Sequence, residues 1–162
     1  MAETLTKIGR SAKYAVTGAI KGVGDTAQMT LGAARDVLLT AVDGVAQVVT
    51  AAEKAAGQIV SGAVQAAADT GEDVGVAVKS AVKGVVKGAS EVGADVGKTA
   101  VAAVSGAAKA AGDIGADTSK AVEQATSGAI EAAEEIGSDT AEAVRNVLKT
   151  AVKGRETTAA KT

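Results

Sequence analysis

Three consecutive segments of the chain share one pattern: residues 82–103 read VKGVVKGASEVGADVGKTAVAA, residues 104–125 read VSGAAKAAGDIGADTSKAVEQA, and residues 126–147 read TSGAIEAAEEIGSDTAEAVRNV. They align without gaps at a period of 22 residues. Self-similarity at a fixed period of this length is the signature of a repeat architecture. The repeat is therefore the first determinant of the fold.

The same period extends back along the chain to Val16, so that six gapless copies fill residues 16–147. Residues 1–15 precede them as a lead-in segment. Residues 148–162 contain the start of a seventh copy and a polar tail. We expect these three parts to be the organisation of the chain.

Each copy splits into two equal halves. Small or apolar residues mostly fall at positions 1, 4, 5, 8 and 11 of the copy, and again at 12, 15, 16, 19 and 22. This spacing predicts an α-helix. Eleven residues in three turns is about 3.67 residues per turn, close to the α-helical 3.6, so the apolar stripe runs nearly straight along the helix.

The sequence thus predicts an all-α fold, built either as one very long amphipathic helix or as a few long helical segments in an elongated hairpin or bundle. A continuous helix over the repeats would be about 200 Å long. In the alternative, the chain folds back at Gly-rich points such as residues 69–73.

The predicted stripe is a line of small and branched apolar residues that contacts another helix or an apolar surface. We expect the larger side chains, among them Tyr14, Leu38, Ile59 and Leu148, to lie on or near it. The residues assigned to the stripe are Val16, Ile20, Val60, Val64, Gly71, Gly75, Val82, Val86, Gly93, Gly97, Val104, Ile114, Ile130, Ile136 and Val144.

The 20 glycines decide whether such a helix is stable alone. At about 1 kcal/mol each relative to Ala, they cost on the order of 20 kcal/mol in helix propensity. We therefore expect helical order to depend on a partner. Pairs of glycines four residues apart are typical of closely approaching helices, with a deliberately weak apolar stripe as the alternative interpretation. These pairs are Gly18/Gly22, Gly71/Gly75, Gly84/Gly88 and Gly93/Gly97.

Acidic residues also recur in pairs, four residues apart, on the polar side of the predicted helix. We interpret them as a solvated face, with weak bridging of helices by divalent cations as the alternative, or, for Asp117 and Asp139, as helix N-caps if the helix is interrupted. Asp95 with Lys98 and Asp117 with Lys120 are spaced for ion pairs along one helix. The acid pairs are Asp69/Asp73, Glu91/Asp95, Asp113/Asp117 and Glu135/Asp139.

The composition excludes most catalytic chemistry. The chain has no Cys, His, Pro, Trp or Phe, and Tyr14 is its one aromatic residue. Thiolate nucleophiles, Ser-His-Asp triads and ordinary zinc or haem sites are therefore absent. A net charge of −2, from 17 basic and 19 acidic residues, argues against nucleic acid as a partner. We expect no enzymatic activity, no cofactor, no metal and no small-molecule substrate.

The hydropathy pattern places the chain outside the bilayer core. No apolar run approaches the roughly 18 residues of a transmembrane helix, and the N-terminus lacks the apolar core of a secretory signal peptide. We expect a cytoplasmic protein, either free or peripheral on a membrane or granule.

Residues 17–26, TGAIKGVGDT, and residues 99–106, TAVAAVSG, resemble the 11-residue amphipathic repeats of perilipins and synucleins. The resemblance covers nearly the whole chain and is one of period and composition. It implies a long helix lying on lipid, with Thr, Gly, Ala and Val on the contacting face. Late embryogenesis abundant proteins and phasins are more distant resemblances.

Three functional hypotheses follow, none of them enzymatic. In the first, the stripe coats a lipid or other apolar surface, such as a granule. In the second, Gly and Ala allow close packing in a self-assembling bundle or filament, so that the partner is another copy of the chain. In the third, the chain is a desiccation or stress protectant that is disordered until dried or bound.

Overall fold

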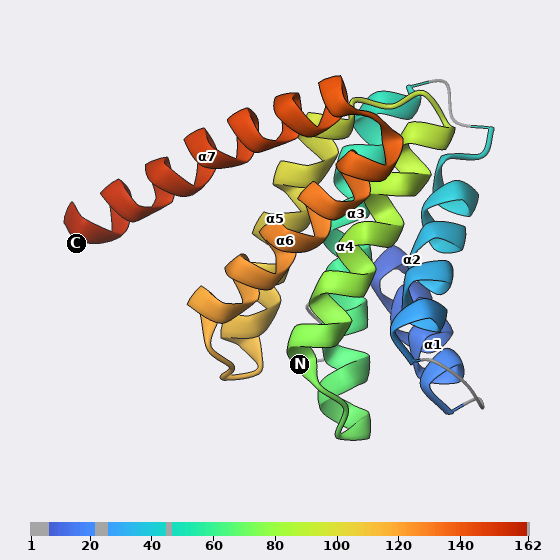
Figure 1. Ribbon diagram of the computed structural model, residues 1–162. Coiled ribbons are helices and arrows are strands. Elements are labelled where there is room, and N and C mark those ends of the chain that lie inside the picture. Colours follow the sequence, from blue (N-terminus) through green and yellow to red (C-terminus); the bar gives the residue numbers. More distant parts are fainter. Residues whose placement is uncertain (1–6, 22–25, 45–46, 162) are drawn as a thin grey trace.

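The computed structural model describes residues 7–21, 26–44 and 47–161, and in these ranges the chain forms helices joined by turns, with no strand (Figure 1). The all-α prediction is confirmed. The helices are α1 (Lys7–Lys21), α2 (Thr26–Val42), α3 (Val48–Thr70), α4 (Val74–Glu91), α5 (Val96–Asp113), α6 (Thr118–Ile136) and α7 (Ser138–Lys161).

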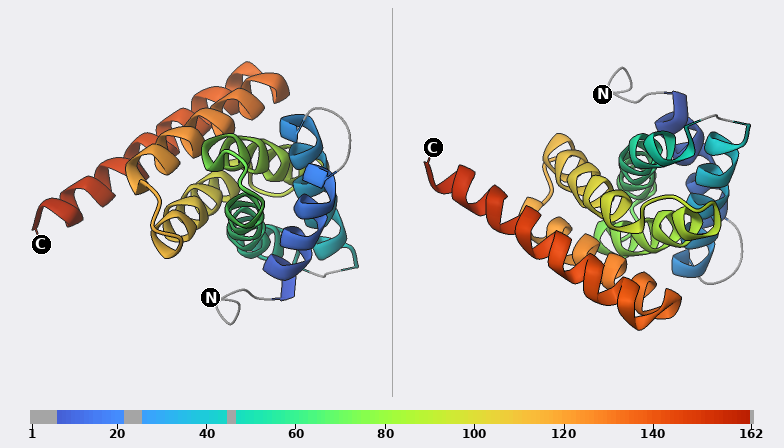
Figure 2. Two further views of the ribbon diagram at one scale, coloured as in Figure 1. Left: turned by 90° about the horizontal axis from the view of Figure 1, so that it is seen from below. Right: turned by 90° about the horizontal axis from the view of Figure 1, so that it is seen from above.

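The helices are stacked in two rows. Each inner helix packs most extensively on the helices two places before and after it: α3 lies between α1 and α5, and α4 lies between α2 and α6. Consecutive helices pack across the rows, α1 on α2, α3 on α4 and α5 on α6. Figure 2 shows this arrangement from below and from above the view of Figure 1. Helix pairs stacked in this way form a solenoid-like array, in which each unit contacts mainly its neighbours.

Three turns of the stack share one design. Gly71, Gly93 and Gly115 end α3, α4 and α5 in the left-handed region, with φ of 77°, 75° and 75°. An L-residue is strained there and glycine is not. Two residues later an aspartate caps the next helix, its Oδ1 accepting from a backbone N–H at 3.1, 2.9 and 3.1 Å in turn. The capping residues are Asp73, Asp95 and Asp117.

These turns explain why the described chain is not one continuous helix. α4, α5 and α6 begin at Val74, Val96 and Thr118, each one repeat period after the last. The longest helix, α7, has 24 residues, or about 36 Å. A single helix spanning all the repeats is therefore not formed, because α3, α4 and α5 each end at a left-handed glycine and an aspartate then caps the next helix. The expected fold-back at 69–73 is found between α3 and α4.

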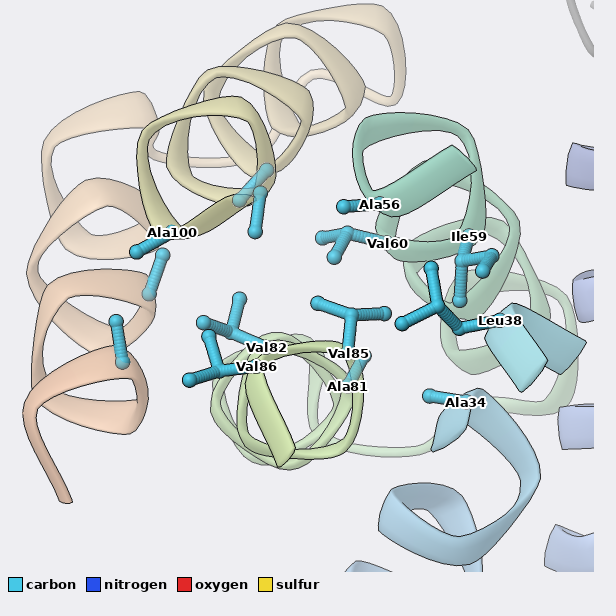
Figure 3. Packing of buried hydrophobic residues seen from close by; sticks show 14 of the residues in the cluster. Ala34, Leu38, Ala56, Ile59, Val60, Ala81, Val82, Val85, Val86 and Ala100 are labelled. Atoms are coloured by element: carbon cyan, nitrogen blue, oxygen red, sulfur yellow. The ribbon is translucent and has the colours of Figure 1, made fainter. Parts of the chain in front are cut away.

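The core lies between the two rows and consists mainly of alanine and valine. Its largest fully buried side chains include Leu38, Ile59 and Leu148. Figure 3 shows Val82 and Val85 of α4 directed into the same interior as Val60 of α3. Tyr14, expected on or near the stripe, is 73% exposed and is not part of this core. Burial here is achieved by many small side chains at close helix separations rather than by large anchors.

α7 differs from the other helices. It packs on both α5 and α6 through Ala141, Val144 and Leu148, which are all buried, and its distal half extends away from the stack (Figures 1 and 2). The helix also includes most of the segment 148–162 that we expected as a partial repeat and polar tail. At the other end, α1 begins at Lys7, inside the expected lead-in segment.

Candidate functional site

The closest contacts between helices occur at four glycines, which we call the seam glycines: Gly62, Gly84, Gly106 and Gly128. Each faces the backbone of the helix two places earlier, and they recur at the repeat period. A Cβ on Gly106 would lie 2.5 Å from the carbonyl oxygen of Gly57, and one on Gly128 would lie 2.5 Å from that of Lys79. Real Cβ atoms do not approach backbone so closely, so only glycine fits.

The other two seams are equally tight. A Cβ on Gly62 would lie 2.8 Å from the backbone nitrogen of Lys13, and one on Gly84 would lie 3.1 Å from that of Arg35. The α1–α3, α2–α4, α3–α5 and α4–α6 contacts therefore share one geometry. One period after Gly128, α7 has a threonine, Thr150, which is exposed. α7 thus lacks the residue that lets the inner helices stack.

The glycine pairs expected from the sequence have mixed outcomes. Gly84 and Gly88 both lie at the α2–α4 contact, where a Cβ on Gly88 would meet the Leu38 side chain at 2.8 Å. Close packing was the wrong interpretation for Gly71, Gly93 and Gly18, where an added Cβ would meet nothing within 4 Å. Gly71 and Gly93 are needed for their positive φ instead. Gly22 lies outside the described residues.

The remaining partners of those pairs are less tightly packed. Gly75 and Gly97 lie in the first turns of α4 and α5. Their nearest neighbours are the side chains of the N-caps, Asp73 at 3.1 Å and Asp95 at 3.4 Å from a Cβ position. Neither position meets the backbone of another helix among its nearest neighbours.

The rest of the predicted stripe is largely interior. Ile114 follows the last residue of α5 and is partly buried, as are Ile130 and Ile136 of α6. The side chain of Ile20 lies outside the described side chains. The stripe residues that are buried are Val16, Val60, Val64, Val82, Val86, Val104 and Val144. The stripe therefore serves the internal contacts of the stack, and in this structure it is not free to lie on an external surface.

Ion pairs connect three of the four helix pairs that meet at the seam glycines, namely α1–α3, α2–α4 and α4–α6. Lys13 Nζ of α1 lies 2.7 Å from Asp69 Oδ2 of α3, and a guanidinium nitrogen of Arg35 in α2 lies 2.8 Å from Glu91 Oε2 of α4. In both pairs the acid follows the base at the same separation along the chain. The Arg35–Glu91 hydrogen bond and charge raise the pKa of Arg35 further above its ordinary value. These exposed pairs set register more than they add stability.

The α4–α6 seam carries a larger group of charges. Glu135 of α6 pairs with Lys87 and, at 3.6 Å, with Lys83, while Lys79 lies 3.0 Å from Glu131. The hydrogen bond from Lys87, aided by the charges of Lys83 and Lys87, lowers the pKa of Glu135 against the opposing effect of desolvation. Positive charge from α4 is thereby matched to negative charge on α6.

The acid pairs do not act as pairs. In each of the first three, the earlier acid belongs to the end of one helix and the later one caps the next helix. The N-cap role expected for Asp117 is confirmed. Asp139 lies in the first turn of α7. The ion pairs expected for Asp95 with Lys98 and for Asp117 with Lys120 are replaced by hydrogen bonds from the backbone N–H of each lysine.

An open groove of about 450 Å³ lies on the outer side of α1 and α2, at the N-terminal end of the stack. We call it the α1–α2 groove. Its apolar and small lining comes from Ile8, Ser11 and Ala15 of α1 and from Ala33, Val37 and Ala41 of α2, and Lys7 and Asp36 also line it. Apolar hollows of this kind mark interaction surfaces more often than catalytic sites when no reactive groups line them.

Neither a metal-binding group of acidic residues nor a membrane-spanning helix occurs in the described part of the chain. Among residues 7–21, 26–44 and 47–161, no group of three or more acidic side chains is placed to hold a metal ion. In the same ranges no helix is long and apolar enough to cross a membrane. Comparison of the chain with protein-family models, with curated proteins and with solved structures finds no match.

Sequence reasoning missed three of the four seam glycines and the long-range ion pairs. Gly62, Gly106 and Gly128 share one position in their 22-residue segments, and that recurrence was the available signal. Lys13 and Asp69 are more than two periods apart in the sequence, and so are Arg35 and Glu91. Pairs expected along one continuous helix are only three or four residues apart, so these contacts were not predicted.

Proposed function

We propose that this chain is a non-enzymatic structural protein in which each 22-residue unit is one helix with its turn, and that the stacked units assemble with further copies of the same chain. The α1–α2 groove is the observation that carries this proposal. It is an apolar, concave surface at the end of a stack whose other helices cover one another. Terminal units of stacked-helix proteins need either a polar cap or a partner.

Self-association explains the distribution of apolar side chains better than an external coat does. The predicted stripe is engaged between the rows, so a surface-coating role would first require the rows to separate. An end groove, in contrast, is accessible in the folded stack. It provides a docking surface without any loss of the seam contacts.

The test is to size the purified chain by light scattering over a dilution series while recording far-UV circular dichroism. We expect helicity to persist on dilution, because the helices pack within one chain, while the particle mass falls from that of an assembly to that of a monomer. A mass equal to one chain at every concentration up to about 1 mM would refute self-association.

A second function, coating of a lipid or other apolar surface, is supported by the composition of the core. Alanine and valine fill most of it, and apart from the exposed Tyr14 the chain has no aromatic side chain to anchor the interior. Each small side chain contributes little burial energy, so separation of the rows is less costly than in a core of large residues. Opening would release the amphipathic stripe for the surface.

Flotation with vesicles of phosphatidylcholine and phosphatidylserine tests this second function, with amide hydrogen exchange on the floated sample. Binding with loss of protection at the Gly57–Gly106 contact would support a coat formed by opening. A chain that stays at the bottom of the gradient, or that floats with all seams protected, would contradict it.

A further inference from the structure

We propose that two copies of this chain form a two-fold symmetric dimer by placing their α1–α2 grooves against each other. The inference rests on the proposed self-association and goes further by naming the surface, the symmetry and the finite size of the assembly. Three observations carry it: the equivalence of groove residues to buried ones, the covering of part of α5 and α6 by α7, and the composition of the groove itself.

The groove continues an interface that is already formed inside the stack. Ala33, Val37 and Ala41 of α2 are followed two periods later by Ala77, Ala81 and Val85 of α4, which are 4%, 0% and 0% exposed. Those three lie on the side of α4 that carries Gly84 and Gly88 and faces α2. Figure 3 shows Val85 beside Leu38 of α2.

The α1 side of the groove shows the same relation. Ile8, Ser11 and Ala15 are followed two periods later by Ala52, Ala55 and Ile59 of α3, all fully buried. The groove thus presents, at the end of the stack, the positions that are covered wherever another helix pair precedes them. The lining residues of the groove have the spacing that contacts a helix pair inside the stack, and the chain itself is the source of such pairs.

At the other end of the stack, α7 covers part of α5 and α6. Ala141, Val144 and Leu148 of α7 lie on α5 and α6 and are 2%, 0% and 1% exposed. Val144 has equivalents in the earlier helices: Ala100 lies two periods before it, and Ala56 lies four periods before it. On α3, Ala56 is directed toward α5, the next helix of its row. In α7 the equivalent side, which includes Val144, packs back onto α5 and α6. Among the described side chains, a second copy would therefore meet α7 rather than the apolar sides of α5 and α6, which disfavours head-to-tail growth.

With the α1–α2 groove as the open apolar surface among the described residues, closed two-fold pairing is the arrangement that covers it in both copies. Such an interface must be complementary to itself. The groove contains one basic and one acidic residue on opposite helices, Lys7 on α1 and Asp36 on α2. Two-fold pairing brings the basic side of one groove to the acidic side of the other, whereas a groove of one charge sign would repel its copy.

Tyr14 supplies a reporter for this surface. It lies three residues after Ser11, one helical turn along the same side of α1, and is 73% exposed. Its equivalent two periods later, Gln58 of α3, is partly buried and its Oε1 is fully enclosed. Tyrosine is enriched at the centre of protein interfaces. We expect Tyr14 to become enclosed in the dimer.

Sedimentation equilibrium of the full chain is the test, with acrylamide quenching of Tyr14 fluorescence on the same samples. We expect a monomer–dimer equilibrium and weaker quenching in the dimer. Val37→Glu places a charge in the groove and is expected to raise the dissociation constant by about 100-fold or more. The matched control is Val147→Glu on α7, a valine that is 39% exposed and lies near Gly97 of α5, at the other end of the stack from the groove, and it should leave the dimer unchanged.

Exposed charges give a second set of variants, which keeps the apolar lining of the groove, and of these residues Asp36 also lies 3.1 Å from its neighbour Arg35. Lys7→Glu and Asp36→Lys are each expected to weaken the dimer by about fivefold, and the double variant to restore it. Dimers that survive Val37→Glu with native helicity, or open-ended polymers that depend on Val147, would overturn this proposal while leaving self-association intact. A wild-type chain that stays monomeric up to about 1 mM would overturn both.

Discussion

The seam glycines place two helix backbones in contact at positions where one added methyl group has no space. At Gly106 the atoms in the way are backbone atoms of Gly57, which have no rotamer to change. The helices themselves would have to move apart. Glycine at these sites lowers helix propensity but lets the two helices approach closely. The high glycine content, which disfavours a lone helix, therefore stabilises the stack.

We expect Gly106→Ala to lower the free energy of unfolding by about 1–3 kcal/mol, because the α3–α5 contact must open to admit the methyl group. The control is Gly32→Ala in α2, where nothing lies within 4 Å of the Cβ position. There the gain in helix propensity should raise stability by up to about 1 kcal/mol. Urea titrations of both variants measure the difference. Equal effects at the two sites would show that the seams are not tightly packed.

Glu135 should give the stack an acid-sensitive contact. Its pKa is lowered in the folded state by Lys87 and Lys83, so the unfolded chain takes up a proton at a higher pH than the folded chain does. The contribution to stability is present above the ordinary glutamate pKa and is lost as the pH falls through the lowered value.

Lys87→Gln should therefore move the pKa of Glu135 back up toward its ordinary value, as read by carbon NMR titration of that carboxyl group. Lys109→Gln, on α5, provides the control and should leave the titration of Glu135 where it was. An unchanged pKa in the Lys87 variant would mean that the hydrogen bond to Glu135 is not formed in solution.

At the scale of elements, the turn between two helices is specified by a glycine and an aspartate two residues apart. Asp95 accepts the N–H of Lys98 at 2.9 Å, and Gly93 supplies the left-handed conformation before it. The two residues have different roles, since Gly93 ends α4 and Asp95 begins α5. Together they turn a periodic sequence into separate helices.

Asp95→Ala is expected to lower the free energy of unfolding by about 1 kcal/mol, because the first turn of α5 loses its side-chain acceptor. Asp95→Asn keeps an acceptor oxygen in the same place and should cost much less. Thermal denaturation followed by circular dichroism compares the two. The cap assignment fails if the asparagine variant is as destabilised as the alanine variant.

The helices and their apolar faces could be predicted from the sequence, but the turns could not be placed with equal certainty. One repeat period equals six helical turns at about 3.67 residues per turn. The apolar residues therefore recur at the same sequence positions whether the helix is continuous or is interrupted by a short turn once per period. Hydrophobic periodicity therefore cannot distinguish a continuous helix from one that is interrupted by a turn. The distinction lies in local chemistry, namely the αL glycine at 71, 93 and 115 and the cap that follows it.

The candidate site was less predictable than the fold. Val16 and Ile8 carry the same apolar pattern, yet Val16 is buried and Ile8 lines an open groove. Their difference arises because α1 stands at the end of the stack and has no earlier helix to cover its outer side. A repeat pattern identifies which face of a helix is apolar, while the position of that helix in the array determines whether the face is covered.

At the scale of the whole molecule, α7 covers the described apolar side chains of α5 and α6, whereas no described helix covers the outer side of α1 and α2. Removing residues 138–162 should expose the apolar side of α5 and α6, including Val104, and leave two uncovered ends. We expect this truncated chain to form large assemblies at concentrations where the full chain forms small ones, as measured by light scattering. A chain ending at Ala151 retains Ala141, Val144 and Leu148 and should behave like the full chain. The cap role is refuted if the two truncations behave alike.

The alternation of helices between two rows restricts how such a chain changes length. Adding one repeat unit would move every later helix to the opposite row and present each with the wrong neighbours. Adding two units would lengthen both rows by one helix and leave the groove at one end and the α7 cap at the other unchanged. The stack is therefore extendable in whole helix pairs, so that its length can vary in fixed steps while its two end surfaces stay the same.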